Sequence, residues 1–291
     1  MDKSLFLEVK QKGRGISQKR RDKIHNAYDR YSRPVEKQFE NLLIGMFNDQ
    51  AKRLRIAYNK VIKESKNENG MSEKDAEKLA KDIVVSIAIW DIIENETLMG
   101  LFSAYLNAGE QGNTLSILLS GEDVLFNVIR KEYVIWVNTQ GAKQIKRVTE
   151  TTKDIVRRVV KNGLIDGVST SNIAKEIESK VKELGKKRAI TIARTEVHNS
   201  MMFAREVNFK RAGFQYWRWI SSKDERVRGN KPTDRFNHIQ NDNVIRKIGD
   251  KFPSGITRPG DPLGEPGNII NCRCDVIPAT KEEYEKQRGA A

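Results

Sequence analysis

The segment KKRAITIARTEVHNSMMFAREVNFKRAG, residues 186–213, decides how the C-terminal half of this chain folds. At about 100° of rotation per residue, its apolar side chains fall on one stripe of a helix. The stripe consists of Ala189, Ile190, Ala193, Val197, Met201, Ala204 and Val207. One border carries Arg194, His198 and Arg205, and Glu196 falls near the other. Because a lone desolvated charge is costly, the helix must dock against groups that pair with these side chains. We favour an ion-paired core helix over a catalytic one.

The whole chain is basic and long enough for two folded units. It has 291 residues, and its 53 Lys and Arg exceed its 39 Asp and Glu, which gives a net charge of +14. A chain of this length buries a sizeable core and commonly divides into two units. The positive surplus favours an anionic partner: nucleic acid, an acidic protein surface or a membrane headgroup layer.

Membrane insertion and secretion are not expected. No apolar run reaches the roughly 18–20 residues of a membrane-spanning helix. The N-terminal MDKSLFLEVKQKGRG is too polar for a secretory signal peptide. Two cysteines do not form the disulfide framework of an extracellular domain. We therefore predict folding in a reducing cytoplasm.

The N-terminal half is predicted to be helical behind a basic arm, which is either solvated or in contact with nucleic acid or a partner. Apolar residues at three- and four-residue steps predict a long helix that begins at Pro34. A Ser72-x-x-Asp75 start signal opens a second helix, which ends near Leu101 and completes an antiparallel hairpin. The irregular residues 108–142 follow, with NAGEQGN as a loop and EYVIWVN as a short apolar piece.

The C-terminal half changes character along its length. Two helices precede the quoted segment, and Gly185 is expected to close the second of them. The aromatic FQYWRWISS, residues 214–222, predicts a strand, and four prolines and four glycines predict a long fixed loop over 252–267. NIINCRCDVIP, residues 268–278, predicts a closing strand.

The predicted fold class is α+β, with a mainly helical N-terminal and central part and a small α+β C-terminal domain that contains short strands and a long Pro/Gly loop. The predicted segments are a basic N-terminal arm (1–33), a helical domain with a long hairpin and an irregular segment (34–142), a C-terminal domain (143–280) and a charged tail (281–291).

The two cysteines of the chain lie one residue apart in the closing strand. Residues i and i+2 of a strand point to the same face, so Cys272 and Cys274 make a poor disulfide but can reach one soft cation. Zinc prefers four tetrahedral ligands, and His238 would supply a third. Asp224 is the natural fourth candidate, with His198 as the substitute. Zinc is therefore the candidate cofactor, although no cofactor is firmly indicated.

A packing role for the cysteines is the favoured alternative. Free cysteine behaves as a small hydrophobe and is among the most buried residue types. The alternation of the strand would then point both thiols inward and Arg273 outward. The charged residues around them would form a polar network that joins Asp224, Arg226 and His238 to Glu196 and Arg194.

Six short motifs follow one another within residues 190–278. They are Arg194-Thr195-Glu196, Trp219, Asp224 with Arg226 and Arg228, His238, Gly260-Asp261-Pro262, and Asn271-Cys272-Arg273-Cys274. In this order they resemble the phage Mu F-like (SPP1 gp7-like) minor head proteins, a family of phage head morphogenesis proteins. In the family the histidine closely follows Arg-x-Arg, whereas here GNKPTDRFN separates Arg228 from His238.

The resemblance makes residues 143–280 a head morphogenesis domain and implies a minor capsid protein of a tailed bacteriophage. Such a protein works beside the portal protein, the scaffold and the major capsid protein, and aids head assembly, DNA packaging or DNA delivery. Its implied location is the virion, and the host cytoplasm during assembly, with non-specific contact to double-stranded DNA and no membrane partner. The family-motif residues are Arg194, Thr195, Glu196, Asp224, Arg226, Arg228, His238, Asp261, Asn271 and Arg273.

An enzymatic role is the alternative to assembly. In a nuclease-like enzyme, His238, Asp224, Glu196 and the nearby arginines would together provide the base, the metal ligand and the phosphate clamp. No complete catalytic motif is present, so we expect a protein without catalytic residues.

Overall fold

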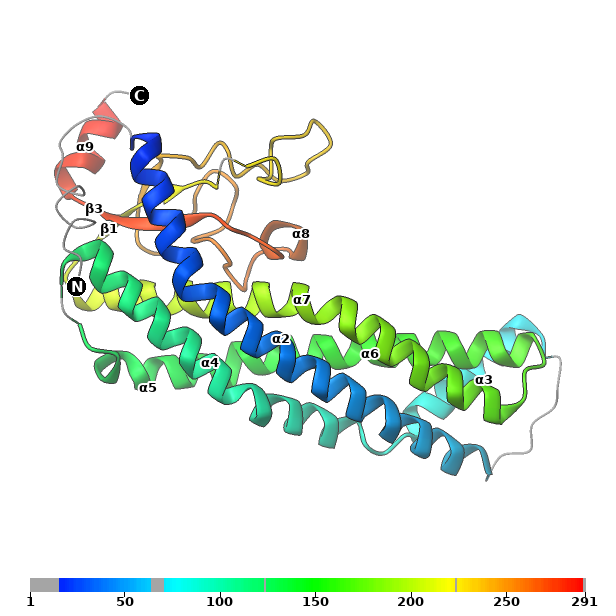
Figure 1. Cartoon of the computed structure of the whole chain (residues 1–291). Helices are drawn as coiled ribbons and strands as arrows, with labels where there is room; N and C mark the ends of the chain where they lie inside the picture. Colours follow the sequence, from blue (N-terminus) through cyan, green and yellow to red (C-terminus); the bar gives the residue numbers. More distant parts are fainter. Residues whose placement is uncertain (1–15, 64–70, 123, 223, 290–291) are drawn as a thin grey trace. The chain divides into compact units, whose positions relative to one another are not determined.

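The computed structural model describes residues 16–63, 71–122, 124–222 and 224–289 (Figure 1). The chain divides into two compact units. The first comprises Met1–Lys37, Ala104–Asn138 and Ala193–Ala291, and the second comprises Gln38–Ser103 and Thr139–Ile192. Helices are the main structure, and a small antiparallel sheet lies near the C-terminus, which confirms the predicted α+β fold class.

The helices come first along the chain: α2 (Gln18–Lys63), α3 (Glu73–Ser86), α4 (Trp90–Ser120), α5 (Phe126–Trp136), the π-helical turn η1 (Val137–Gly141), α6 (Ala142–Ile165) and α7 (Thr170–Arg211). The shorter elements follow: β1 (Tyr216–Ile220), β2 (Ile245–Lys247), α8 (Pro266–Ile269), β3 (Asp275–Ala279) and α9 (Lys281–Gly289). No described helix has an apolar stretch long enough to cross a membrane.

The core of the second unit is built from apolar faces of four helices. Helix α3 buries Ala76, Ala80, Ile83 and Val84, and α6 buries Ile155, Val156, Val159 and Val160; Leu54 and Tyr58 of α2 and Ile173, Ile177 and Val181 of α7 join the same cluster. The Ser72 side chain caps α3 by accepting a hydrogen bond from the Asp75 N–H at 3.2 Å. The predicted start signal is confirmed.

Helix α2 begins at Gln18, so the prediction that it starts at Pro34 is wrong. An interior proline removes one helix hydrogen bond and its ring crowds the carbonyl four residues back, at a cost of about 3 kcal/mol, which burial of the apolar face on both sides of Pro34 offsets. Here the buried stripe continues upstream of the proline through Ile24 and Tyr28. The described part of the predicted arm, including SQKRRDK, is therefore helical from Gln18 onward; residues 1–15 lie outside the described chain.

Two glycine-based predictions are wrong for a common reason. NAGEQGN is part of α4 rather than a loop, and Gly185 lies inside α7 rather than at a helix end. A Cβ at Gly112 would lie 2.6 Å from the Met201 carbonyl oxygen, and one at Gly185 would lie 2.6 Å from Phe47. These glycines permit close packing of helices, which a single sequence cannot distinguish from a turn.

Four other segments also differ from expectation. The predicted second helix is interrupted at residues 87–89, where the Trp90 indole N–H donates to the Val84 carbonyl at 2.8 Å. The apolar EYVIWVN lies in α5 and η1. The closing strand β3 begins only at Asp275, and most of the predicted tail forms helix α9, in which Tyr284 stacks on Tyr216.

The sheet has the order β2-β1-β3, with both pairs antiparallel. The predicted aromatic strand is β1, where Trp217 and Trp219 are fully buried and pair with Pro278 and Val276 of β3. Behind the sheet, Arg205 of α7 forms a salt bridge with Asp275, and both side chains are 0% exposed. The sheet thus holds the segment between β1 and β3, which carries most motif residues, against α7.

Candidate functional site

The two cysteines and His238 converge on one point. Sγ of Cys272 lies 3.7 Å from Nδ1 of His238, and Sγ of Cys274 lies 3.6 Å from the same atom. All three residues are buried, and their ligand atoms lie within 4.8 Å of one another. Both cysteines precede β3 in irregular backbone, so the expected strand geometry is wrong although both thiols do face one histidine. They are free thiols, as the argument against a disulfide predicts.

The orientation of His238 is set by Asn268, which the sequence analysis missed. The Asn268 amide donates to the Ser254 carbonyl at 3.0 Å, which turns its Oδ1 toward Nε2 of His238 at 2.7 Å. Because Oδ1 only accepts, Nε2 carries the hydrogen and the Nδ1 lone pair of the neutral ring faces both sulfurs. The one available signal was the position of Asn268 in the cysteine segment.

His198 approaches the cysteines from α7. Its Nδ1 lies 2.8 Å from the Tyr28 hydroxyl, whereas its Nε2 has no hydrogen-bond partner among the described residues. The hydrogen bond with Cys274 holds the pKa of the Cys272 thiol well below its ordinary value, and His198 and His238 lower this pKa further. Burial raises the pKa of the Cys274 thiol. The pKa values of the two thiols are therefore shifted in opposite directions.

Asp224 does not join the cysteines. Its carboxylate forms a salt bridge with Arg273 and accepts a hydrogen bond from the Arg226 N–H at 2.9 Å. Within the described chain, the group able to hold a metal consists of His238, Cys272 and Cys274. The ligand set with Asp224 as its fourth member is not formed.

The three residues of the Arg-Thr-Glu motif have separate surroundings. Arg194 is exposed and lines a cleft. The Thr195 hydroxyl accepts a hydrogen bond from the Asn271 N–H at 3.1 Å, which fastens the turn before Cys272 to α7. Glu196 is buried and accepts from the Tyr105 hydroxyl at 3.0 Å. The structure therefore gives two residues of this motif separate hydrogen bonds and leaves Arg194 at the surface of the cleft.

Arg228 and Asp261 hold the long loop. Arg228 donates from Nε to the Gly267 carbonyl at 2.5 Å and from Nη2 to the Ile270 carbonyl, which occupies acceptors at the end of α8. Asp261 accepts from the N–H and hydroxyl of Thr257 at 2.9 and 2.7 Å, and from the Leu263 N–H at 3.0 Å. Burial alone would raise the pKa of Asp261, but the hydrogen bonds from Thr257 and Leu263 outweigh it and lower the pKa.

We expect Asp261→Asn to reduce the fall in the free energy of unfolding between pH 7 and pH 3. A lowered folded-state pKa stabilises the fold above the unfolded value, near 3.8, and this contribution disappears as pH falls through the folded pKa. The free energy of unfolding of the variant at pH 7 should be lower by about 1–2 kcal/mol. Hydrogen bonds to an ionised group contribute about 1.5–3 kcal/mol, and Asn retains some of them. Urea unfolding between pH 7 and pH 3 measures both effects. Equal pH slopes for Asp261→Asn and wild type would contradict the assignment, and exposed Asp250→Asn is the control.

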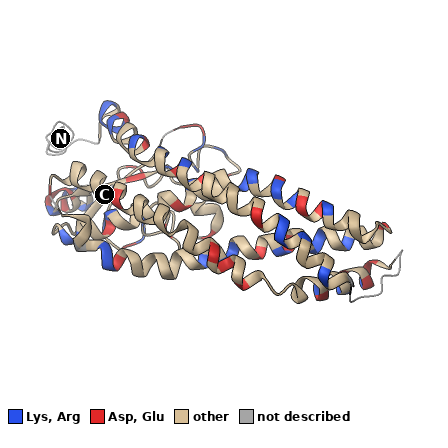
Figure 2. Ribbon diagram, turned by 60° about the horizontal axis from the view of Figure 1, so that its bottom comes forward, with Lys and Arg blue, Asp and Glu red and all other residues tan. Residues whose placement is uncertain are grey.

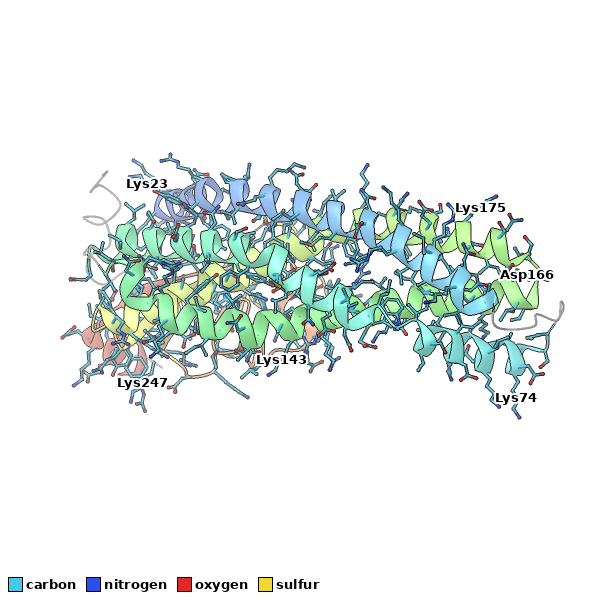
Figure 3. The ribbon with its side chains drawn as sticks, turned by 90° about the horizontal axis from the view of Figure 1, so that it is seen from below. Lys23, Lys74, Lys143, Asp166, Lys175 and Lys247 are labelled. Atoms are coloured by element: carbon cyan, nitrogen blue, oxygen red, sulfur yellow. The ribbon has the colours of Figure 1, made fainter. Side chains whose placement is uncertain are left out.

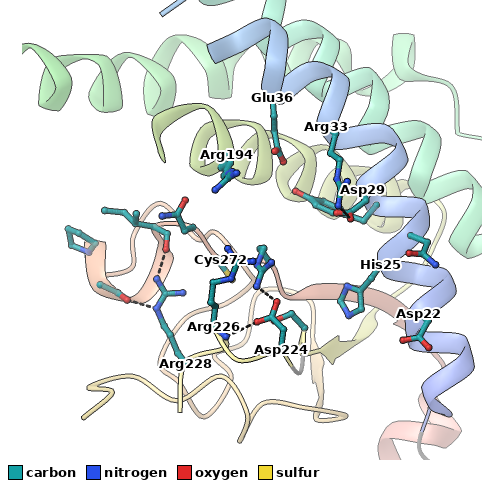
Figure 4. Close-up of a pocket in the computed structure, with 18 residues that line it drawn as sticks. Asp22, His25, Asp29, Arg33, Glu36, Arg194, Asp224, Arg226, Arg228 and Cys272 are labelled. Carbon is teal, nitrogen blue, oxygen red and sulfur yellow. Dashed lines mark hydrogen bonds and ion pairs between the residues drawn. The ribbon is translucent and has the colours of Figure 1, made fainter. Parts of the chain in front are cut away.

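A cleft of about 1270 Å³ opens beside Cys272 (Figure 4). Side chains from α2, from α7 and from the segment after β1 face one another across it. Its charged lining is mixed: Arg33, Arg194, Arg226, Arg228 and Arg273 face Asp22, Asp29, Glu36 and Asp224. Arg194 and Arg226 make no salt bridge among the described residues, so they are available to an anionic group.

The three residues considered for a nuclease do not form one centre. His238 faces the cysteines, Asp224 pairs with Arg273, and Glu196 bonds to Tyr105. The expected arrangement of base, metal ligand and phosphate clamp is absent from the part of the chain that the structure describes.

The comparisons with known proteins agree with the motif order. The family model described as phage Mu protein F like protein matches residues 154–277, which include every motif residue from Arg194 to Cys274. No curated protein and no solved structure matches the chain. The predicted resemblance is thereby confirmed over residues 154–277, which match the phage Mu F-like family of phage head morphogenesis proteins.

Proposed function

We propose that the protein is a minor head component of a tailed bacteriophage that acts beside the portal protein, the scaffold and the major capsid protein. The observation that carries the proposal is the family match over 154–277, the segment that holds the cysteine cluster and much of the cleft lining. The protein would assemble in the host cytoplasm, remain in the virion, and aid head assembly, DNA packaging or DNA delivery without catalysing a reaction.

Mass spectrometry of purified head particles tests this role. A few copies per particle that remain after a high-salt wash, counted against the portal protein, are the expected result. Absence from immature and mature particles alike would contradict the proposal. Copies removed by the wash would indicate a loosely associated packaging factor instead of a head component.

Non-specific DNA contact is the second part of the proposal, and α6 supports it. This helix has seven Lys and Arg and two Asp and Glu within residues 142–165. At about 100° per residue, all nine fall within an arc of about 140°, opposite the apolar face that enters the core. Figure 2 shows the basic residues distributed along the helices.

Several α6 cations lack a carboxylate partner. Lys153, Arg157 and Lys161 form salt bridges, whereas Lys143, Lys146 and Arg158 are exposed and make none among the described residues. Lys143 extends away from the ribbon, as Figure 3 shows. Free cations on one face of a helix suit phosphate groups spaced along a duplex.

We predict that duplex DNA binds without sequence preference and that its affinity falls steeply with salt. Each phosphate contact contributes about 0.9 to the slope of log K against log salt concentration, so Lys143→Gln, Lys146→Gln and Arg158→Gln together should reduce the slope by up to about 3. Fluorescence anisotropy at several salt concentrations measures it.

The matched control removes the same charge elsewhere in the second unit. Lys74, Lys78 and Lys81 are exposed on α3, where four acidic residues accompany them, and Lys74 also extends outward in Figure 3. Their replacement with Gln should leave the slope nearly unchanged. An equal reduction of the salt slope in the two triple variants would show that net charge, rather than the α6 face, governs DNA binding.

A further inference from the structure

The spacing of the Cys272, Cys274 and His238 ligand atoms matches a shared metal ion. Tetrahedral zinc, with Zn–S of about 2.3 Å and Zn–N of about 2.0–2.1 Å, holds sulfur and nitrogen about 3.5–3.6 Å apart. The two sulfurs lie 3.7 and 3.6 Å from Nδ1 of His238. We propose that Cys272, Cys274 and His238 form a structural zinc site, with His198 as the candidate for its fourth ligand position.

Packing gives the two thiols and the histidine only weak hydrogen bonds to one another. The neutral ring offers one lone pair at Nδ1, and a single lone pair accepts one S–H in its plane, yet both sulfurs approach this atom. A metal ion resolves the arrangement, because all three atoms then point at the ion. The Asn268 acceptor on Nε2 is the outer partner that a metal-binding imidazole commonly has.

His198 is the candidate for the fourth ligand position, and it would have to move toward the ion, because its ring nitrogens lie outside the group whose ligand atoms are within 4.8 Å of one another. Its side chain is 1% exposed, and its Nε2 has no hydrogen-bond partner among the described residues, which is costly for a buried polar atom. If Nδ1–H donates to the Tyr28 oxygen 2.8 Å away, the Nε2 lone pair is free to bind the ion.

The site would cross-link three distant parts of the first unit. His198 lies on α7, His238 lies between β1 and β2, and the cysteines lie just before β3. In the described part of residues 221–274, regular structure is limited to β2 and α8, which are three and four residues long. A structural metal adds its binding free energy to folding where regular structure is sparse.

Cobalt titration of the full-length chain tests the site. The apo protein, prepared under reducing conditions, should bind one Co²⁺ per chain and show the visible bands of tetrahedral cobalt together with a near-ultraviolet thiolate-to-cobalt band. One equivalent of Zn²⁺ should abolish both. Because the chain has only two cysteines and three histidines, the bands report on few residues. A folded protein that binds no stoichiometric Co²⁺ or Zn²⁺ would overturn the proposal.

Variants assign the ligands. Cys274→Ser should weaken the thiolate band by about half, and His198→Ala should lower zinc affinity at least tenfold and change the visible bands. Asn268→Ala should lower affinity about 10–100-fold, as losing an outer partner does. His25→Ala is the control, because this cleft histidine lies beside the Ser221 carbonyl and is outside the ligand set. Unchanged spectra and affinity in His198→Ala would remove His198 from the site.

A second measurement on the wild-type chain covers the case in which variants do not fold. One equivalent of zinc should slow reaction of both thiols with a thiol reagent and raise the melting temperature. Equal thiol reactivity with and without zinc would contradict ligation by the cysteines.

Discussion

Arg205→Met is expected to lower the free energy of unfolding by about 3–5 kcal/mol, because it leaves a buried carboxylate without its counter-charge. Arg205 and Asp275 are both 0% exposed, and Arg205 also donates to the Val276 carbonyl. The pair joins α7 to β3, so the loss should appear as cooperative unfolding of the first unit. Urea unfolding followed by tryptophan fluorescence measures it, since Trp217 and Trp219 lie in the adjoining strand.

The double variant Arg205→Met with Asp275→Leu separates charge burial from packing. It leaves no buried charge and should recover most of the loss, as replacement of buried ion pairs with apolar residues often does. Arg205 Nε and Asp275 Oδ2 lack hydrogen-bond partners among the described residues, which further favours an apolar replacement. Lys210→Met on the same helix is the control, because Lys210 is half exposed and should change stability by less than about 0.5 kcal/mol. A loss in Arg205→Met no greater than in this control would contradict the prediction.

Gly112→Ala is expected to lower the free energy of unfolding by about 1–3 kcal/mol, because the added methyl group overpacks a helix contact. The added Cβ would lie 2.6 Å from the Met201 carbonyl oxygen and 2.7 Å from its Cα. These are backbone atoms, so α4 and α7 must separate in the first unit to make room. Chemical unfolding of the full chain gives the change in stability.

Gly45→Ala is the matched control, because the same substitution at this position should raise stability instead of lowering it. Gly45 lies in α2, is exposed, and has no atom within 4 Å of the position of an added Cβ. Ala is a better helix former than Gly, so this variant should gain about 0.5–1 kcal/mol. If both variants are stabilised, the close helix contact at Gly112 is not maintained in solution.

The candidate site was predictable in composition but not in arrangement. The spacing of Cys272 and Cys274, with His238 as a partner, pointed to the cluster that the structure contains. The expected fourth ligand, Asp224, instead pairs with Arg273, its neighbour in space. Asp224 could pair with an arginine or join a metal site. Which of the two occurs depends on distances across the fold, and a single sequence does not contain these distances.

The sequence by itself determined the α+β class, the aromatic strand β1, the start of α3 at Ser72 and the family resemblance of residues 154–277, because these depend on local periodicity, capping and motif order. Tertiary structure alone decided the continuity of α2 through Pro34 and the helical path through Gly112 and Gly185. In each case burial against a distant segment outweighs the local preference of the backbone.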